Sequence, residues 1–95
     1  MGLLGLRHVA LNVRDPQASK RFYADCFGMH VVWEPDPDNV YLSSGWDNLA
    51  LHRAPAPQPG ALDHLGFIVG LREDVDQLAE RFRERGITIA AEPRD

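Results

Sequence analysis

The sequence has little of several features that would define its class. It holds a single cysteine, Cys26, so an intrachain disulfide is excluded. The position of Cys26 in a predicted helix favours a small buried apolar group; a catalytic thiol is the alternative, although no activating neighbour is evident. No apolar run approaches the ~20 residues that cross a bilayer, and the N-terminus lacks the charged start and the cleavage site of a signal peptide. We therefore expect a cytoplasmic protein without a membrane partner.

Positive charge is also scarce. Ten Lys and Arg residues stand against 14 Asp and Glu residues, the net charge is −4, and Lys20 is the only lysine. This balance argues against nucleic acid as a partner, because a phosphate backbone requires a basic face. The sequence also lacks a Gly-rich phosphate loop, a Cys-x-x-Cys pair and a nucleophile elbow. What is left is a globular chain of 95 residues, long enough for one small core.

An internal repeat is the main positive feature. Residues 6–13 read LRHVALNV, and residues 62–69 read LDHLGFIV. In both stretches an apolar residue comes first, a polar residue second, histidine third and valine last. Each stretch is followed by an amphipathic segment that stops at a glycine, Gly28 in the first copy and Gly86 in the second. Such a repeat predicts two copies of one supersecondary unit.

The first copy predicts the order strand, helix, strand, strand, strand. Residues 6–13 alternate between apolar and mixed faces, as a strand does. Asp15 and Pro16 predict the start of a helix, and Gly28 predicts its end in a left-handed cap. Three further strands, separated by turns at 35–39 and 45–48, are predicted over residues 29–34, 40–44 and 49–53.

The second copy is shorter. Residues 54–60, with three prolines at alternate positions, predict a stiff linker. A strand over 62–69, a helix over 72–85 and a strand over 87–91 follow, and two more strands would complete the copy. We therefore predict an α+β fold of paired βαβββ modules in a single domain, residues 1–95. The first module covers 6–53, and the second, an incomplete βαβ unit, covers 61–95.

Particular residues strengthen this prediction. They are HVALNV at 8–13, Asp15, Phe22-Tyr23 in the helix, FGM at 27–29 and DHLGFIV at 63–69. Together they resemble the vicinal oxygen chelate superfamily, which includes glyoxalase I, extradiol dioxygenases and bleomycin resistance proteins. The resemblance covers almost the whole chain, and it is more specific for the fold than for the reaction.

The resemblance also implies a metal site. The apolar faces of the two repeat strands would pack under helices, which leaves His8 and His64 on the concave side as ligands of a divalent Fe, Zn, Ni, Co or Mn ion. The alternative is that each histidine is satisfied by a local hydrogen bond. The family's third ligand position falls on Ala50, whose side chain cannot coordinate a metal ion. His52 lies on the same face and is a candidate ligand in place of Ala50. The alternative is that His52 is an exposed residue at the end of the strand. The fourth ligand of the family, usually Glu, would lie beyond Asp95.

The implied function is that of a metalloprotein acting on a small molecule with vicinal oxygens, by lyase, isomerase or ring-cleaving dioxygenase chemistry. Asn12 is a candidate for a polar contact to this molecule. Trp33, Tyr41 and Trp46 are candidates for lining its cleft, or else packing groups. The alternative function is a metal-free module that sequesters a drug or metabolite, as the bleomycin-resistance type does. An unpaired edge of the second sheet predicts a homodimer, and sedimentation as a monomer at micromolar concentration would contradict it.

Overall fold

The computed structural model describes residues 2–55 and 61–94. The chain divides into two compact units, Met1–Gln58 and Pro59–Asp95. The boundary between them falls in the predicted linker, residues 54–60, of which 56–60 lie outside the described residues.

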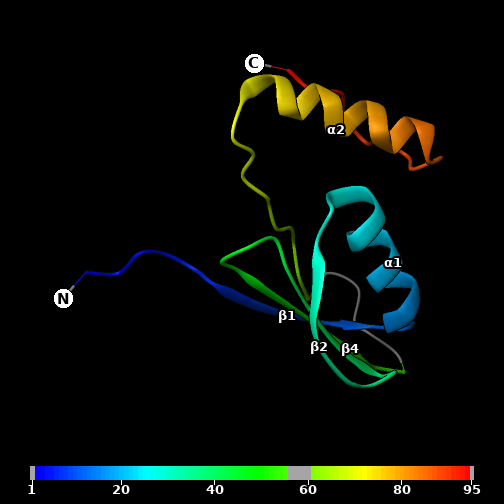
Figure 1. Ribbon diagram of the computed structural model, residues 1–95. Helices are drawn as coiled ribbons and strands as arrows, with labels where there is room; N and C mark the ends of the chain where they lie inside the picture. The colour runs from blue at the N-terminus through cyan, green and yellow to red at the C-terminus, as the bar shows by residue number, and fades with distance from the viewer. Residues whose placement is uncertain (1, 56–60, 95) are drawn as a thin grey trace. The chain divides into compact units, whose positions relative to one another are not determined.

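The first unit is a four-stranded mixed sheet with one helix (Figure 1). β1 (His8–Val13) leads into α1 (Pro16–Phe27), and β2 (His30–Asp36), β3 (Asn39–Ser43) and β4 (Asn48–Arg53) follow. The strand order is β1-β4-β3-β2, with β1 parallel to β4 and the other neighbours antiparallel. This is the predicted βαβββ module, and its topology brings the first and last strands side by side.

α1 begins and ends where the sequence predicts. The Asp15 carboxylate accepts hydrogen bonds from the backbone N–H groups of Gln17 at 3.1 Å and Ala18 at 3.2 Å. Pro16 occupies the first helical turn, where its missing N–H costs nothing. Gly28 ends the helix with φ 68°, a conformation that a residue without a Cβ adopts at little cost.

The core of the first unit lies between α1 and one face of the sheet, because α1 contacts β2, β3 and β4. The buried apolar side chains of this unit on that side are Cys26, Met29, Val40, Leu42, Leu49 and Leu51. Each large aliphatic group among them contributes about 1.5–3 kcal/mol by leaving water. Cys26 is only 3% exposed, which agrees with its expected role as a small buried apolar group.

β2 is longer than predicted. Pro35 and Asp36 belong to this strand and not to the predicted turn at 35–39. β2 is an edge strand whose register with β3 shifts between Trp33 and Asp36, so a proline there interrupts no central ladder. The remaining turn is held by Asp36 Oδ1, which accepts a hydrogen bond from the backbone N–H of Asp38 at 2.8 Å.

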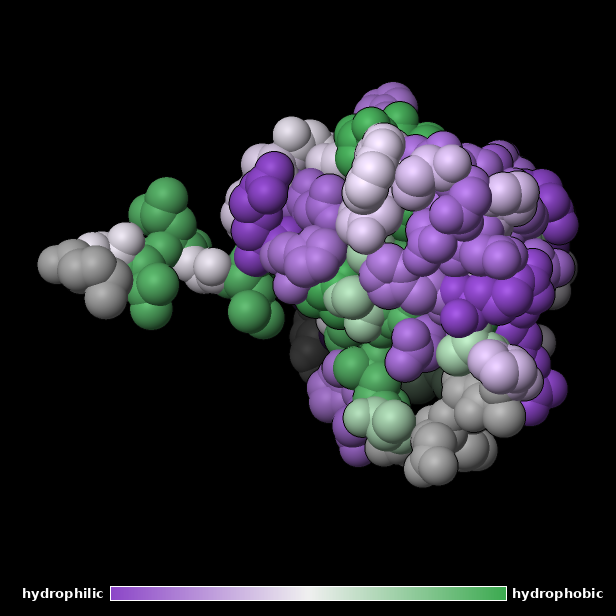
Figure 2. All heavy atoms as spheres, turned by 90° about the horizontal axis from the view of Figure 1, so that it is seen from below, coloured by the Kyte–Doolittle hydropathy of each residue, from purple (hydrophilic) through white to green (hydrophobic). Residues whose placement is uncertain are grey.

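An apolar segment precedes β1. Figure 2 shows it as a hydrophobic stretch that stands clear of the neighbouring surface. Its three leucines are strongly exposed: Leu3 by 85%, Leu4 by 97% and Leu6 by 83%. β1 itself begins at His8, two residues later than the strand predicted over 6–13.

The second unit contains α2 (Arg72–Glu84), close to the helix predicted over 72–85. The Asp74 carboxylate accepts a hydrogen bond from the backbone N–H of Leu71 at 2.9 Å, which satisfies a donor at the helix start. Gly86, with φ 73°, follows the helix as the sequence predicts. Neither α2 nor any other helix among the described residues is long and apolar enough to cross a membrane.

The segments that flank α2 differ from the prediction. Residues 62–69 and 87–91 were predicted as strands, but neither is paired in a sheet in the described part of the second unit. A strand is stable only against a hydrogen-bonded neighbour, which an alternating apolar pattern does not supply by itself. The alternation persists in the exposure of the side chains, since those at 65, 67 and 69 are half-buried and those at 64, 66 and 68 are exposed.

An exposed ion pair joins α1 to β2. Lys20 Nζ lies 3.0 Å from Glu34 Oε1, and Gln17 Nε2 donates a hydrogen bond to Glu34 Oε2 at 3.1 Å. The hydrogen bond from Lys20, followed by that from Gln17, holds the pKa of Glu34 below its ordinary value of 4.5.

We expect this pair to make the free energy of unfolding depend on pH. A carboxyl group whose pKa is lowered by folding stabilises the native state above its unfolded pKa, and that contribution is lost as the pH falls through the folded pKa. The wild type is therefore expected to be more stable than Glu34→Gln at neutral pH, and the two are expected to converge below pH 4.5. Denaturant titrations of both proteins across this range measure the difference. A difference that does not change with pH would contradict the assignment.

Candidate functional site

The face of the sheet opposite α1 carries most of the predicted site residues. Successive residues of a strand point to opposite faces, and residues directly across a ladder share a face. We call this surface the histidine face. By register and ring contacts it includes His8, Ala10, Asn12, Trp33, Asn39, Tyr41, Asn48, Ala50 and His52.

His8 is paired with Asn48 on the neighbouring strand. The two residues are directly opposite in the parallel β1/β4 ladder, and His8 Nδ1 is hydrogen-bonded to Asn48 Oδ1 at 2.7 Å. The Cβ atoms of directly opposed residues are close, so the short amide side chain reaches the ring. The ring of His8 is thus held on the histidine face by a partner from a different strand.

His52 forms a second pair of the same kind. It lies directly opposite Asn39 in the antiparallel β3/β4 ladder, and its Nδ1 is hydrogen-bonded to Asn39 Oδ1 at 2.7 Å. On its other side His52 lies opposite Asn12 of β1, so both predicted residues occupy the same end of the face. His52 is half-buried, which argues against the alternative of an exposed strand-end residue.

Tyr41 lies between the two histidine pairs. Its ring centroid is 6.4 Å from that of His8, in a stacked arrangement, and 5.7 Å from that of His52, edge to face. The ring of Trp33 is 4.9 Å from Tyr41 on its β2 side. Directly opposite Tyr41 is Ala50, whose small side chain leaves room for these rings. The structure therefore brings four of the predicted residues, His8, Trp33, Tyr41 and His52, into one aromatic row.

The turn before β4 positions Asn48. Asp47 Oδ1 accepts a hydrogen bond from the backbone N–H of Ser44 at 2.6 Å, and the Ser44 hydroxyl donates to Asp47 Oδ2 at 2.5 Å. Partial burial raises the pKa of Asp47, but the hydrogen bonds from Ser44 and Ser43 outweigh it and lower the pKa overall. The charged, well-bonded Asp47 thus fixes the backbone at the point where β4 begins.

Two predicted residues lie elsewhere. Trp46 is on the turn between β3 and β4, where its side chain is 63% exposed and its carbonyl accepts a hydrogen bond from Arg7 Nε at 2.9 Å. His64 belongs to the second unit, where its Nδ1 is 2.5 Å from Asp63 Oδ1 and both side chains are exposed. The binding of one metal ion by His8 and His64 together therefore stays a prediction.

The described residues give a partial fit to a metal site. Imidazole nitrogens are good ligands for divalent transition metals, and His8 and His52 each offer one. Ala50, at the position where the resemblance places the third ligand, is fully buried and has no donor atom. Within residues 2–55 and 61–94, no three His, Cys, Asp or Glu side chains are close enough together to hold one ion.

Sequence reasoning missed the two asparagines. Asn39 and Asn48 fall in the predicted turns at 35–39 and 45–48, where asparagine needs no further explanation. Their importance depends on strand register, which places each of them directly across from a histidine. The only available signal is the alternation of Asn48, Ala50 and His52 along one strand.

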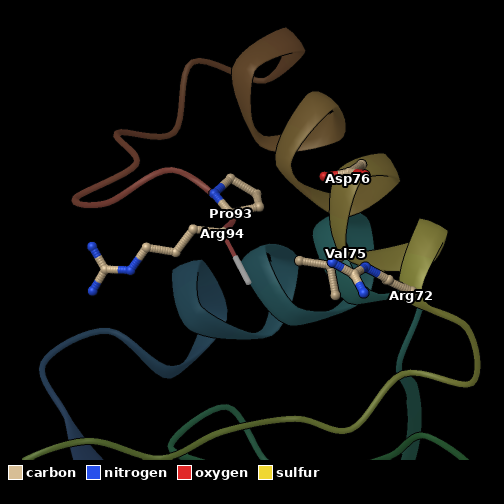
Figure 3. A pocket seen from close by; sticks show the side chains of 5 residues that line it. All are labelled: Arg72, Val75, Asp76, Pro93 and Arg94. Atoms are coloured by element: carbon tan, nitrogen blue, oxygen red, sulfur yellow. The ribbon is translucent and has the colours of Figure 1, made fainter.

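A cavity in the second unit is lined by none of the predicted site residues. It measures about 180 Å³ and is lined by Arg72, Val75, Asp76, Pro93 and Arg94. Figure 3 shows that the guanidinium group of Arg94 points away from Arg72 and Val75. The two positive groups therefore do not converge on a common ligand position.

Comparisons with known proteins agree with the fold. A family model described as "Glyoxalase/Bleomycin resistance protein/Dioxygenase superfamily" matches residues 5–95. A possible glyoxalase from Bacillus cereus is similar, with a TM-score of 0.74, 24% identity and coverage of 88% of this chain and 76% of the other. A lactoylglutathione lyase from Agrobacterium tumefaciens has a TM-score of 0.73, 20% identity and coverage of 96% and 77%. The fosfomycin resistance protein FosX from Listeria monocytogenes has a TM-score of 0.78, 19% identity and coverage of 99% and 74%.

Proposed function

The chain belongs to the Glyoxalase/Bleomycin resistance protein/Dioxygenase superfamily, and on this basis we propose that its histidine face binds a small molecule through a divalent metal ion held by His8 and His64. The molecule would carry two adjacent oxygen atoms that chelate the ion. A bound ion would supply Lewis-acid polarisation of those oxygens and a template for their orientation. The reaction class is that of a lyase, isomerase or dioxygenase.

The observation that carries this proposal is the hydrogen bond between His8 Nδ1 and Asn48 Oδ1. Histidines that bind metal usually engage their other ring nitrogen with a protein acceptor, which orients the ring and makes the ligating nitrogen more basic. His8 has this arrangement at the start of β1, which is the place that the resemblance gives to the first ligand.

The other residues of the histidine face have roles that do not depend on the ion. Tyr41 and Trp33 offer aromatic surface for the apolar part of the molecule. Asn12 offers an amide for its polar groups. His52, held by Asn39, offers a nitrogen that accepts a proton from the molecule or serves as a further ligand.

A ligand titration tests the proposal. Lactoylglutathione and fosfomycin are suitable probes because proteins of similar fold carry their names. We expect at least one probe to quench the fluorescence of Trp33 in the Zn²⁺- or Mn²⁺-loaded protein, and we expect EDTA to abolish the effect. The variant Trp46→Phe, altered on the turn outside the aromatic row, leaves Trp33 as the one tryptophan and is the matched control. Its fluorescence should be quenched over the same range of probe concentration as that of the wild type. Quenching that is unchanged by EDTA would contradict the role of the metal.

A second candidate function is favoured by Ala50. This residue has no donor atom, is fully buried and lies across from Tyr41 in the centre of the histidine face. A metal-free module that sequesters a drug or metabolite would use the aromatic row alone. In the same titration it predicts an affinity that survives EDTA and falls when Tyr41 is replaced by alanine.

A further inference from the structure

The two histidine–asparagine pairs share one geometry. In each pair the residues are directly opposite across a ladder that includes β4, and in each the imidazole Nδ1 is 2.7 Å from an amide Oδ1. Asn48, Ala50 and His52 alternate along β4. Asn48 lies opposite His8, His52 lies opposite Asn39, and Ala50, between them, lies opposite Tyr41. The same contact therefore occurs twice on one face, with different strands supplying the histidine.

An amide oxygen accepts hydrogen bonds and cannot donate them, so each contact requires a hydrogen on Nδ1. A neutral imidazole carries only one hydrogen, and Nε2 then keeps its lone pair. We propose that Asn48 and Asn39 are positioning residues that set the tautomers of His8 and His52. Both rings then present an unprotonated Nε2, on the edge of the ring away from the asparagine.

This arrangement restricts the chemistry of the molecule that the face binds. An unprotonated Nε2 repels the lone pairs of a bare carboxylate or carbonyl oxygen. It attracts a hydroxyl hydrogen or a metal ion that carries the oxygen. The histidine face therefore favours hydroxyl-bearing or metal-chelated ligands at two positions beside Tyr41. This consequence for ligands rests on the proposed function, whereas the tautomers themselves do not.

Long-range ¹H–¹⁵N correlation spectra of the ¹⁵N-labelled, metal-free chain test the tautomers directly. The spectra are recorded at alkaline pH, where imidazoles are neutral, because the ¹⁵N shifts of Nδ1 and Nε2 then report which nitrogen carries the hydrogen. We expect His8 and His52 to be protonated on Nδ1. In Asn48→Leu, His8 is expected to change to the Nε2-protonated form that a free side chain favours, while His52 keeps its signal. In Asn39→Leu, His52 is expected to change to the Nε2-protonated form, while His8 keeps its signal.

Each leucine variant is thus the matched control for the other. Asn48→Asp keeps an acceptor opposite His8, so His8 should keep its hydrogen on Nδ1 in this variant. This variant therefore distinguishes an effect of the lost hydrogen bond from an effect of misfolding. Wild-type rings protonated on Nε2 would overturn the proposal, because the amide groups would then be donating to Nδ1. An unchanged His8 signal in folded Asn48→Leu would overturn it as well. Failure of the metal or ligand experiments leaves these spectra unaffected, so the two proposals fail separately.

Discussion

Replacing His8 by alanine is expected to weaken the binding of a divalent metal ion by at least about 100-fold. Removing only a residue that is hydrogen-bonded to a metal ligand already lowers the metal affinity about 10–100-fold, and the loss of a ligand itself costs more. His8 is the proposed first ligand, and its ring is already oriented by Asn48 before an ion arrives. Alanine removes the donor atom without placing a new group on the histidine face. Calorimetric titration of the metal-free protein with Zn²⁺ measures the change.

The chain offers a matched control for this substitution. His30 is exposed at the start of β2, which is the edge strand at the opposite side of the sheet from β1, and it lies opposite Ser43. His30→Ala therefore removes an imidazole from the same unit without removing a proposed ligand. Its affinity for Zn²⁺ should equal that of the wild type. Equal losses in the two variants would mean that the ion binds surface histidines without a defined site.

Replacing Leu42 by alanine is expected to lower the free energy of unfolding by about 2–5 kcal/mol, the usual cost of a Leu→Ala change in a well-packed core. Leu42 is fully buried in β3, on the face that α1 covers. The change removes contacts and leaves a cavity that its rigid neighbours do not fill. Because small domains are stable by only about 5–15 kcal/mol, the first unit is expected to lose a large part of its stability.

Leu4→Ala is the control, since it makes the same chemical change in the same unit at a side chain that is 97% exposed. It is expected to change the free energy of unfolding by less than about 0.5 kcal/mol. Urea titrations followed by circular dichroism compare the two variants with the wild type. Similar effects of both substitutions would mean that the core does not lie beneath α1.

The sequence was most informative where the determinants are local. The start of α1 follows from the side chain of Asp15 and the ring of Pro16, and its end follows from the conformational freedom of Gly28. These effects act within a few residues, so they can be recognised without knowledge of the fold. The same holds for α2, which ends shortly before Gly86.

Pairing between distant segments was harder to predict. Residues 62–69 have the alternating pattern of a strand, and their exposure alternates accordingly, but the described part of the second unit pairs them with no neighbour. The pattern specifies which side chains face inward and leaves the hydrogen-bonded partner open. β2 shows the opposite error, because its edge position accommodates Pro35, which the sequence placed in a turn.

The candidate site shows the same division. Alternation along each strand was enough to place His8 and Asn12 on one face of β1, and Ala50 and His52 on one face of β4. Only the register between strands brings Asn48 opposite His8 and Asn39 opposite His52, and two turn-like asparagines thereby become partners of histidines. The relation of His8 to His64 depends on two separate units, so it calls for an experiment on the whole chain.

The most direct test of the proposed function is the metal content of the purified whole chain. Wild type and the double variant His8→Ala/His64→Ala are loaded with Zn²⁺, dialysed against metal-free buffer and examined by elemental analysis. We predict that the wild type retains a stoichiometric divalent ion and that the double variant retains none. Equal retention by the two proteins would contradict the assignment of His8 and His64 as ligands.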